Sequence, residues 1–179
     1  MSLLERWRHT IGQRRTRASL RSIADRLLRD VLLSDGLGGH IGVDALLLRD
    51  GRLYILVIRH ADGAIFAGEK MDHWAVIGQY ERLRFDNPLH RLHDQLAVLR
   101  MLVPELLLEP RIVFTGHGHF PKGRPPGVEL LEEFVRPLRR SHKAVAVSLD
   151  TKVETAWNRL CDAARIFSSE ETPRRAPTK

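Results

Sequence analysis

Asp44 and Arg59 are the residues of this 179-residue chain whose spacing first suggests chemistry, because they lie on the two strands of a predicted β-hairpin. Asp44 enters the first strand, and Arg59 ends the second in the triplet Val57-Ile58-Arg59. A carboxylate at a sheet edge can hold Mg²⁺ against a phosphate, and a nearby lysine can help to activate water. The chemistry that such a hairpin supports is metal-dependent cleavage of a phosphodiester, with Asp44 as the candidate metal ligand.

Four histidines offer a second candidate metal site. His90 and His93 are three residues apart on a predicted helix, and His117 and His119 lie close together in a predicted loop. Four imidazoles can bind Zn²⁺, but this spacing matches no compact zinc motif. We therefore interpret these side chains as surface and loop histidines.

The hairpin that positions Asp44 is the clearest structural signal in the sequence. Two apolar segments, residues 43–48 and 53–58, flank Asp50 and Gly51. Asp-Gly suits a type I′ turn because both central residues take positive φ. The second segment is apolar at consecutive positions, which predicts a central strand buried on both faces.

Helices are predicted on either side of this hairpin. From Leu20 to Leu32, apolar residues recur at spacings of three and four, which is typical of an amphipathic helix. Asn87-Pro88 opens a second helix, since asparagine caps well and proline is tolerated in the first turn. A capping-box pattern starts a third helix at Thr151.

Further strands are expected at residues 64–67, 74–77, 111–115 and 128–135. The order of elements predicts an α/β fold with a central mixed sheet flanked by helices. We expect a single domain over residues 18–167, with a basic N-terminal arm at residues 1–17 and a disordered polar tail at residues 168–179.

The charge balance favours a polyanionic partner. Lys and Arg total 29 against 22 Asp and Glu, for a net charge of +7, and 24 of the 29 are arginine. The guanidinium suits phosphate and stacked bases, so we expect nucleic acid, although a general preference for arginine in the genome is an alternative. The candidate nucleic-acid-binding residues are Arg6, Arg8, Arg14, Arg15, Arg17, Arg21 and Arg91.

Several protein classes are excluded by composition. The single cysteine, Cys161, rules out an intrachain disulfide, and its place in a helical pattern predicts a core residue rather than a nucleophile. No apolar segment is long enough to span a bilayer, and the first residues lack the apolar core of a signal peptide. We expect a cytoplasmic protein with no membrane partner.

The order of these features resembles the NERD (nuclease-related) domain, a branch of the PD-(D/E)XK nuclease-like superfamily. The resemblance extends over roughly residues 18–135 and implies a restriction-endonuclease-like core. It rests on the following segments: Gly42-Val43-Asp44, residues 53–58, Ala61-Asp62-Gly63, Trp74, Asn87-Pro88 and residues 111–115.

The sequence departs from the family pattern where cleavage is expected. Val57-Ile58-Arg59 stands in place of Glu-x-Lys, so that one carboxylate is lost and the lysine becomes an arginine that cannot act as a base. Arg91 stands where a glutamine is expected after Asn-Pro, and no acid is evident on the first helix. Asp44 is left either as a weak Mg²⁺ ligand or as the partner of Arg59 in a structural ion pair.

Three functional hypotheses follow. The first is a NERD-like domain with an impaired cleavage centre at Asp44 and Arg59, which binds nucleic-acid backbone and needs no cofactor. The second is an active nuclease using Mg²⁺ or Mn²⁺, with relocated acids such as Asp62, Glu69 or Asp72, or with histidine ligands. The third is a protein-interaction scaffold that reuses the fold.

Overall fold

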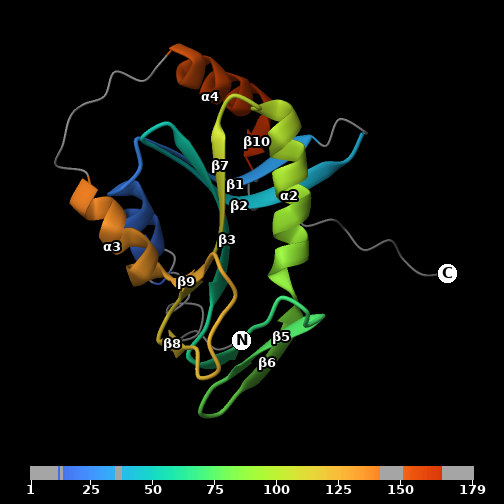
Figure 1. Ribbon diagram of the computed structural model, residues 1–179, viewed down its shortest axis with the longest axis vertical. Helices are drawn as coiled ribbons and strands as arrows, with labels where there is room; N and C mark the ends of the chain where they lie inside the picture. The colour runs from blue at the N-terminus through green and yellow to red at the C-terminus, as the bar shows by residue number, and fades with distance from the viewer. Residues whose placement is uncertain (1–11, 13, 35–37, 142–150, 167–179) are drawn as a thin grey trace.

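A six-stranded mixed sheet forms the centre of the computed structural model, which describes residues 12, 14–34, 38–141 and 151–166 (Figure 1). The strand order is β10-β1-β2-β3-β7-β9; β1, β2 and β3 pair antiparallel, whereas β7 is parallel to β3 and β9 is parallel to β7. The strands of this sheet are β1 Arg26–Ser34, β2 His40–Arg49, β3 Arg52–His60, β7 Leu107–Thr115, β9 Val128–Leu130 and β10 Ala164–Ile166. The predicted α/β architecture is confirmed.

The β2–β3 hairpin has the predicted turn. Asp50 and Gly51 adopt φ values of 49° and 73°, as a type I′ turn requires. The Asp25 carboxylate accepts the backbone N–H of Asp50 at 2.9 Å and also pairs with Arg49, whose side chain is buried. β3 lies between β2 and β7 and is buried on both faces, as its continuous apolar sequence predicts.

The predicted helix over residues 20–32 is wrong. A helix covers residues 14–21, which we call the N-terminal helix, and β1 follows it. The N-terminal helix spans residue 17, where we expected the basic arm to end. Residues 1–11 and the expected tail, residues 168–179, lie outside the described residues.

A change of face within β1 explains this error. Leu28 and Val31 pack into the same core cluster although they are three residues apart, whereas residues on one face of a regular strand are two apart. Asp30 lies between them with a φ of 52°, a left-handed conformation that aspartate tolerates. The resulting spacing of three imitates one turn of an amphipathic helix.

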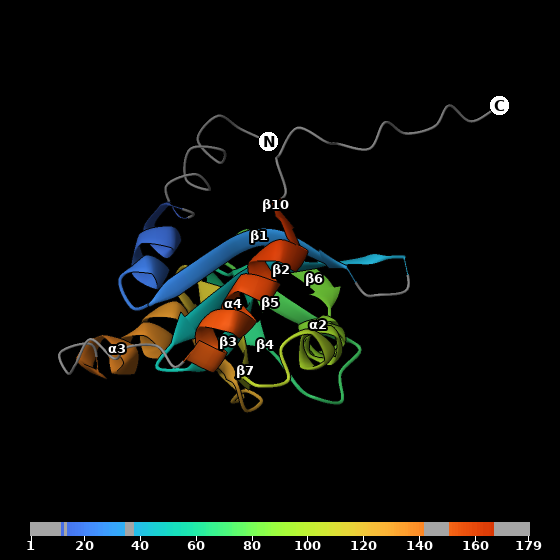
Figure 2. The ribbon, with the colours of Figure 1, turned by 90° about the horizontal axis from the view of Figure 1, so that it is seen from above.

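Helices cover both faces of the sheet (Figure 2). α2 (Pro88–Leu102) and α4 (Thr151–Ala163) pack on one face, and the N-terminal helix and α3 (Leu131–Ser141) pack on the other. As predicted, α2 begins after Asn87, whose side chain accepts the Leu89 N–H at 3.0 Å. α4 begins at Thr151, again as predicted.

The strand predicted at residues 128–135 is only three residues long, and α3 starts directly after it. Leu131, Phe134, Val135 and Leu138 are spaced as a helical stripe and pack into the cluster beneath α3. The Glu133 carboxylate accepts the Leu130 N–H at 2.9 Å, which caps the first turn.

A smaller four-stranded sheet, in the order β6-β5-β4-β8, lies at one end of the molecule (Figure 1). Its strands are β4 Gly63–Phe66, β5 His73–Ile77, β6 Arg82–Asp86 and β8 Gly118–His119. β4 and β5 agree with the prediction, whereas β6 and the short β8 and β10 were not predicted. Among the described helices, none has an apolar segment of the length that crossing a bilayer requires.

Candidate functional site

Asp44 lies where the ladder between β2 and β3 stops. The last pair in the ladder is Ala45 with Leu56, so Asp44 lies beyond the paired residues. Its Oδ2 atom accepts the backbone N–H of Ile58 at 2.8 Å, in place of the next ladder hydrogen bond. The carboxylate thus joins the ends of the two strands.

Arg91 reaches Asp44 from the helix that packs over this face. Its Nη2 atom donates to Asp44 Oδ1 at 2.7 Å and to the carbonyl oxygen of Gly42 at 3.0 Å. Gln95, one turn further along α2, donates from Nε2 to the same Gly42 oxygen at 2.7 Å. These bonds fix α2 against β2, and they make Arg91 part of the Asp44 centre.

Gln95 is a site residue that the sequence analysis missed. Its side chain is completely buried, and its Oε1 atom has no hydrogen-bond partner among the described residues. The spacing of four between Arg91 and Gln95, which places both on one side of a helix, is the signal in the sequence that could have identified it.

Arg59 supplies a second guanidinium. Its Nη1 atom lies 3.6 Å from Asp44 Oδ2 and donates to the Ile58 carbonyl at 3.0 Å. Burial lowers the pKa of Arg59, the Asp44 carboxylate raises it, and neighbouring Arg91 lowers it. The ion pair between Asp44 and Arg59, one of two interpretations left open by the sequence, is present.

Val57 occupies the position of the expected glutamate and is fully buried in the core cluster beneath α2. One carboxylate with two guanidiniums and an N–H donor gives a net positive group whose oxygens already accept hydrogen bonds. Mg²⁺ takes oxygen ligands and repels cations. The described residues around Asp44 therefore do not fit a divalent metal ion.

The family model of the nuclease-related domain, NERD, matches residues 8–115, which is more than half of the chain. The chain belongs to the NERD family. The matched segment contains Asp44, Arg59 and Arg91, and the mixed sheet with flanking helices is consistent with a nuclease-like fold. No curated protein and no solved structure gave a significant match.

The acids considered as relocated ligands lie elsewhere in the NERD domain. Asp62 accepts the backbone N–H of His117 at 2.7 Å, and its Oδ2 atom lies 3.2 Å from His60 Nε2. The His117 N–H bond is the main reason that the pKa of Asp62 is lowered. Glu69 and Asp72 are exposed in the segment before β5, and no contact of either side chain with Asp44 exists among the described residues.

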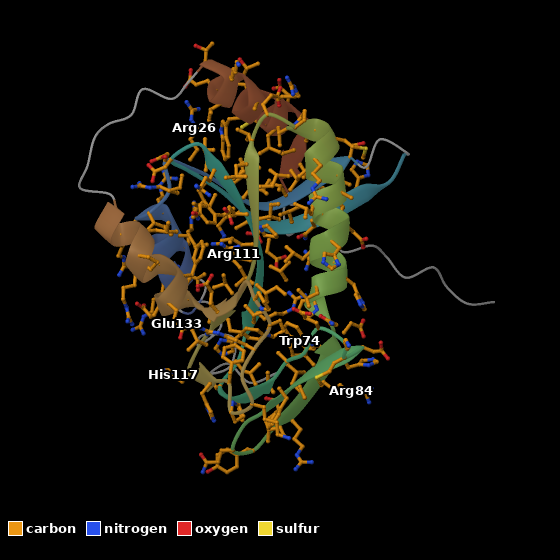
Figure 3. All side chains as sticks on the ribbon, viewed as in Figure 1. Arg26, Trp74, Arg84, Arg111, His117 and Glu133 are labelled. Carbon is orange, nitrogen blue, oxygen red and sulfur yellow. The ribbon has the colours of Figure 1, made fainter. Side chains whose placement is uncertain are left out.

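The four histidines are divided between two parts of the structure. His90 and His93 are exposed on α2, whereas His117 is bound to Asp62 near the end of the sheet (Figure 3). Within the described ranges, no group of three or more His, Cys, Asp or Glu residues is arranged to hold a metal ion.

Cys161 is exposed on α4, so the prediction of a core cysteine is wrong. The buried residues of α4 are Ala156, Trp157 and Leu160, and Cys161 falls beside this stripe. Partial burial raises the pKa of its thiol, which disfavours the reactive thiolate.

The predicted nucleic-acid-binding arginines occupy two places. Arg14, Arg15, Arg17 and Arg21 are exposed on the N-terminal helix, whereas Arg91 lies on the other side of the sheet. Arg6 and Arg8 lie outside the described residues. Binding of nucleic acid by any of these residues stays a prediction.

Proposed function

We propose that this NERD protein is impaired as a nuclease and binds nucleic-acid backbone through a basic surface. The observation that supports the impairment is the pairing of Asp44 with Arg59 and Arg91. Both arginines are cations, and Arg91 donates a hydrogen bond to the carboxylate, which therefore already has cationic partners. Under this proposal the protein requires neither Mg²⁺ nor Mn²⁺, and we keep the cytoplasm as its compartment.

Val57 and Arg59 also support the proposed loss of cleavage activity. A buried apolar side chain supplies no metal ligand, and a guanidinium does not take up a proton from water. Even a metal ion held by Asp44 alone would lack a second protein anchor at this position. Asp44 and Arg59 therefore act as structural residues at the former cleavage centre.

The proposed binding is supported by the net charge of +7 and by the arginines of the N-terminal helix. Contacts between guanidiniums and phosphates release counterions, so affinity falls steeply as salt rises. A protein that contacts about four phosphates loses roughly a hundredfold in affinity between about 50 and about 200 mM salt. Sequence preference is expected to be weak, because backbone contacts carry no base information.

Filter binding tests this proposal with labelled DNA and RNA at low and moderate salt. We expect binding that weakens steeply with salt and does not depend on divalent metal. Absence of affinity for every nucleic acid at low salt would contradict the binding proposal and favour the scaffold hypothesis.

A cleavage assay tests the impairment separately. Plasmid and single-stranded substrates are incubated with Mg²⁺ or Mn²⁺, and we expect no cleavage above the metal-only control. Metal-dependent cleavage that Asp44→Ala abolishes would overturn the impairment and favour an active nuclease.

A further inference from the structure

Exposed arginines are concentrated on the two helices that cover one face of the sheet. The set consists of Arg14, Arg15, Arg17, Arg21, Arg136 and Arg139. We call these six residues the arginine surface. Within the described part of the chain, none of the six forms a side-chain hydrogen bond or an ion pair. Their charges therefore face solvent.

Few acidic residues on the two helices neutralise the positive charge of the arginine surface. The N-terminal helix contains no Asp or Glu, and α3 contains Glu132 and Glu133. Glu133 is already paired with Arg124 and caps α3 through the Leu130 N–H. Arg136 also interacts electrostatically with Glu133, so six cations face two acids and the surface is positive.

The cations beneath α3 are different because acids neutralise them. Arg111 pairs with Glu109 at 3.0 Å and with Glu129 at 3.4 Å, and Arg52 pairs with Glu109 at 2.8 Å. Figure 3 shows Arg111 on the sheet and Glu133 on α3. On this side of the sheet, the described cations without an ion pair lie on the outer sides of the two helices.

The two helices form one continuous surface. Leu20 and Ile23, at and just after the end of the N-terminal helix, share a core cluster with Phe134 and Val135 of α3. Figures 1 and 2 both draw the two helices on the same side of the sheet. Arg136 and Arg139 are three residues apart, which places them on one side of α3.

This surface lies on the face opposite the Asp44 centre. Arg91 and Gln95 approach Asp44 from α2, and α2 packs into the other core cluster. A polyanion held on the arginine surface is therefore separated from Asp44 by the thickness of the sheet.

The residues of the arginine surface favour double-stranded over single-stranded nucleic acid. Proteins that prefer single strands stack bases on exposed aromatic rings, but Phe134 is the one aromatic residue in residues 14–21 and α3, and it is buried. A duplex also carries a denser row of phosphates than a single strand. No large apolar side chain is exposed on either described helix, so insertion into a lipid surface has no support.

We infer that the arginine surface formed by the N-terminal helix and α3 binds the phosphate backbone of double-stranded nucleic acid, away from the Asp44 centre. This inference rests on the proposed function and adds the substrate class, two α3 residues and the location. DNA and RNA duplexes share the paired phosphate rows that it requires.

The test compares two double variants of the full chain. Arg136→Ala/Arg139→Ala removes two cations from the arginine surface, and the matched control, Arg82→Ala/Arg100→Ala, removes two exposed cations from β6 and α2. Binding of fluorescent random-sequence DNA and RNA duplexes, the corresponding single strands and phosphatidylserine vesicles is measured from about 50 to about 200 mM salt. All four substitutions are at exposed positions, and circular dichroism verifies folding.

We expect the wild type to bind duplex more tightly than single strands and vesicles. The α3 variant should lose about tenfold or more in duplex affinity, and its salt slope should fall by about two. The control variant should keep the wild-type slope.

Three results would overturn this inference while the proposed function stands: a single-strand preference, an unchanged slope in the α3 variant, or an equal loss in the control. Binding to vesicles without binding to duplex would overturn it in favour of a membrane surface. If the wild type bound no nucleic acid at all, the proposed function would fail as well.

Discussion

The Asp44 carboxylate serves as a junction between three parts of the backbone. It accepts the Ile58 N–H of β3 and the Arg91 guanidinium of α2, and Arg59 lies within ion-pair distance. Removal of a shared acceptor leaves several donors without partners, and partly buried donors are costly to leave unpaired. This accounts for an aspartate at a centre where the described part of the chain supplies no second acid.

Asp44→Ala is therefore expected to lower the free energy of unfolding by about 2 kcal/mol, as measured by urea denaturation. Asp44→Asn should cost less, because its amide oxygen still accepts the Ile58 N–H. Arg91→Ala should cost less in the Asp44→Ala background than in the wild type, because the two side chains interact directly. Strict additivity of the two substitutions would contradict this account.

Asp62 makes the free energy of unfolding depend on pH. The His117 N–H lowers the pKa of this carboxyl in the folded protein. A lowered pKa contributes stability that is present above the unfolded value of about 4 and is lost as pH falls through the folded value. The difference in unfolding free energy between wild type and Asp62→Asn should thus shrink between about pH 5 and about pH 3.

Urea denaturation across this pH range measures the effect. Glu132→Gln, at an exposed position of α3, controls for the loss of one surface charge. A constant difference for Asp62→Asn across the range would refute the proposed contribution.

Among the elements, α2 depends on an unusual cap. Asn87 is only 2% exposed; its Oδ1 atom accepts the Leu89 N–H, and its Nδ2 atom donates to the carbonyl oxygens of Met71 at 2.8 Å and Glu69 at 3.3 Å. The side chain thus needs an acceptor and a donor together. Asparagine supplies both, whereas aspartate supplies only acceptors.

We expect Asn87→Asp to destabilise the protein nearly as much as Asn87→Ala, by about 2 kcal/mol. At an exposed N-cap the two acceptors are almost equivalent, but here a carboxylate would face carbonyl oxygens at neutral pH. Thermal and urea unfolding of both variants would check this. Wild-type stability in Asn87→Asp would show that the amide donor contributes little.

Prediction of elements from the sequence succeeded where local chemistry decides the structure. The Asp50-Gly51 turn and the Asn87-Pro88 helix start follow from residues adjacent in sequence, and the structure confirms both. Residues 26–34 form a strand where a helix is predicted, because the left-handed Asp30 gives β1 the spacing of a helix. Its conformation is stabilised by pairing with β2, which a local pattern does not reveal.

The candidate site was predictable to a similar extent. Pairing of Asp44 with Arg59 follows from two strands of one hairpin, and it was one of the two interpretations considered. The inward bonds of Arg91 and Gln95 to Gly42 depend instead on how α2 approaches β2. That approach is a tertiary contact between segments about fifty residues apart. The spacing of four shows that Arg91 and Gln95 share one side of α2, but not what they contact.

At the scale of the whole molecule, two core clusters share one sheet. Ile55 and Val57 of β3 face the cluster beneath α2, whereas Leu56 of the same strand faces the cluster beneath α3. Because consecutive residues of one strand belong to both clusters, neither cluster can lose its packing without disturbing the other. A single cooperative transition is expected.

Phe134→Ala tests this coupling. Phe134 is buried in the cluster beneath α3, and its loss should cost about 3 kcal/mol or more. Trp74 and Trp157 lie in the other cluster and report its packing by fluorescence. The midpoints from tryptophan fluorescence and far-ultraviolet circular dichroism should fall together, and separate transitions would show two independent units.

The reversal of faces in β1 also occurs in β2, and this has a consequence for variation in chain length. Val43 and Leu46 pack into one cluster although three positions separate them, and Asp44 lies between them opposite Asp30. Deletion of one residue just after Asp30 in β1 or just after Asp44 in β2 would shift the alternation of the strand by one position. The apolar side chains that follow would then point to the opposite face of the sheet. Single-residue insertions and deletions should therefore be poorly tolerated here, whereas the tip of the β5–β6 hairpin, where Tyr80 is exposed, should accept them.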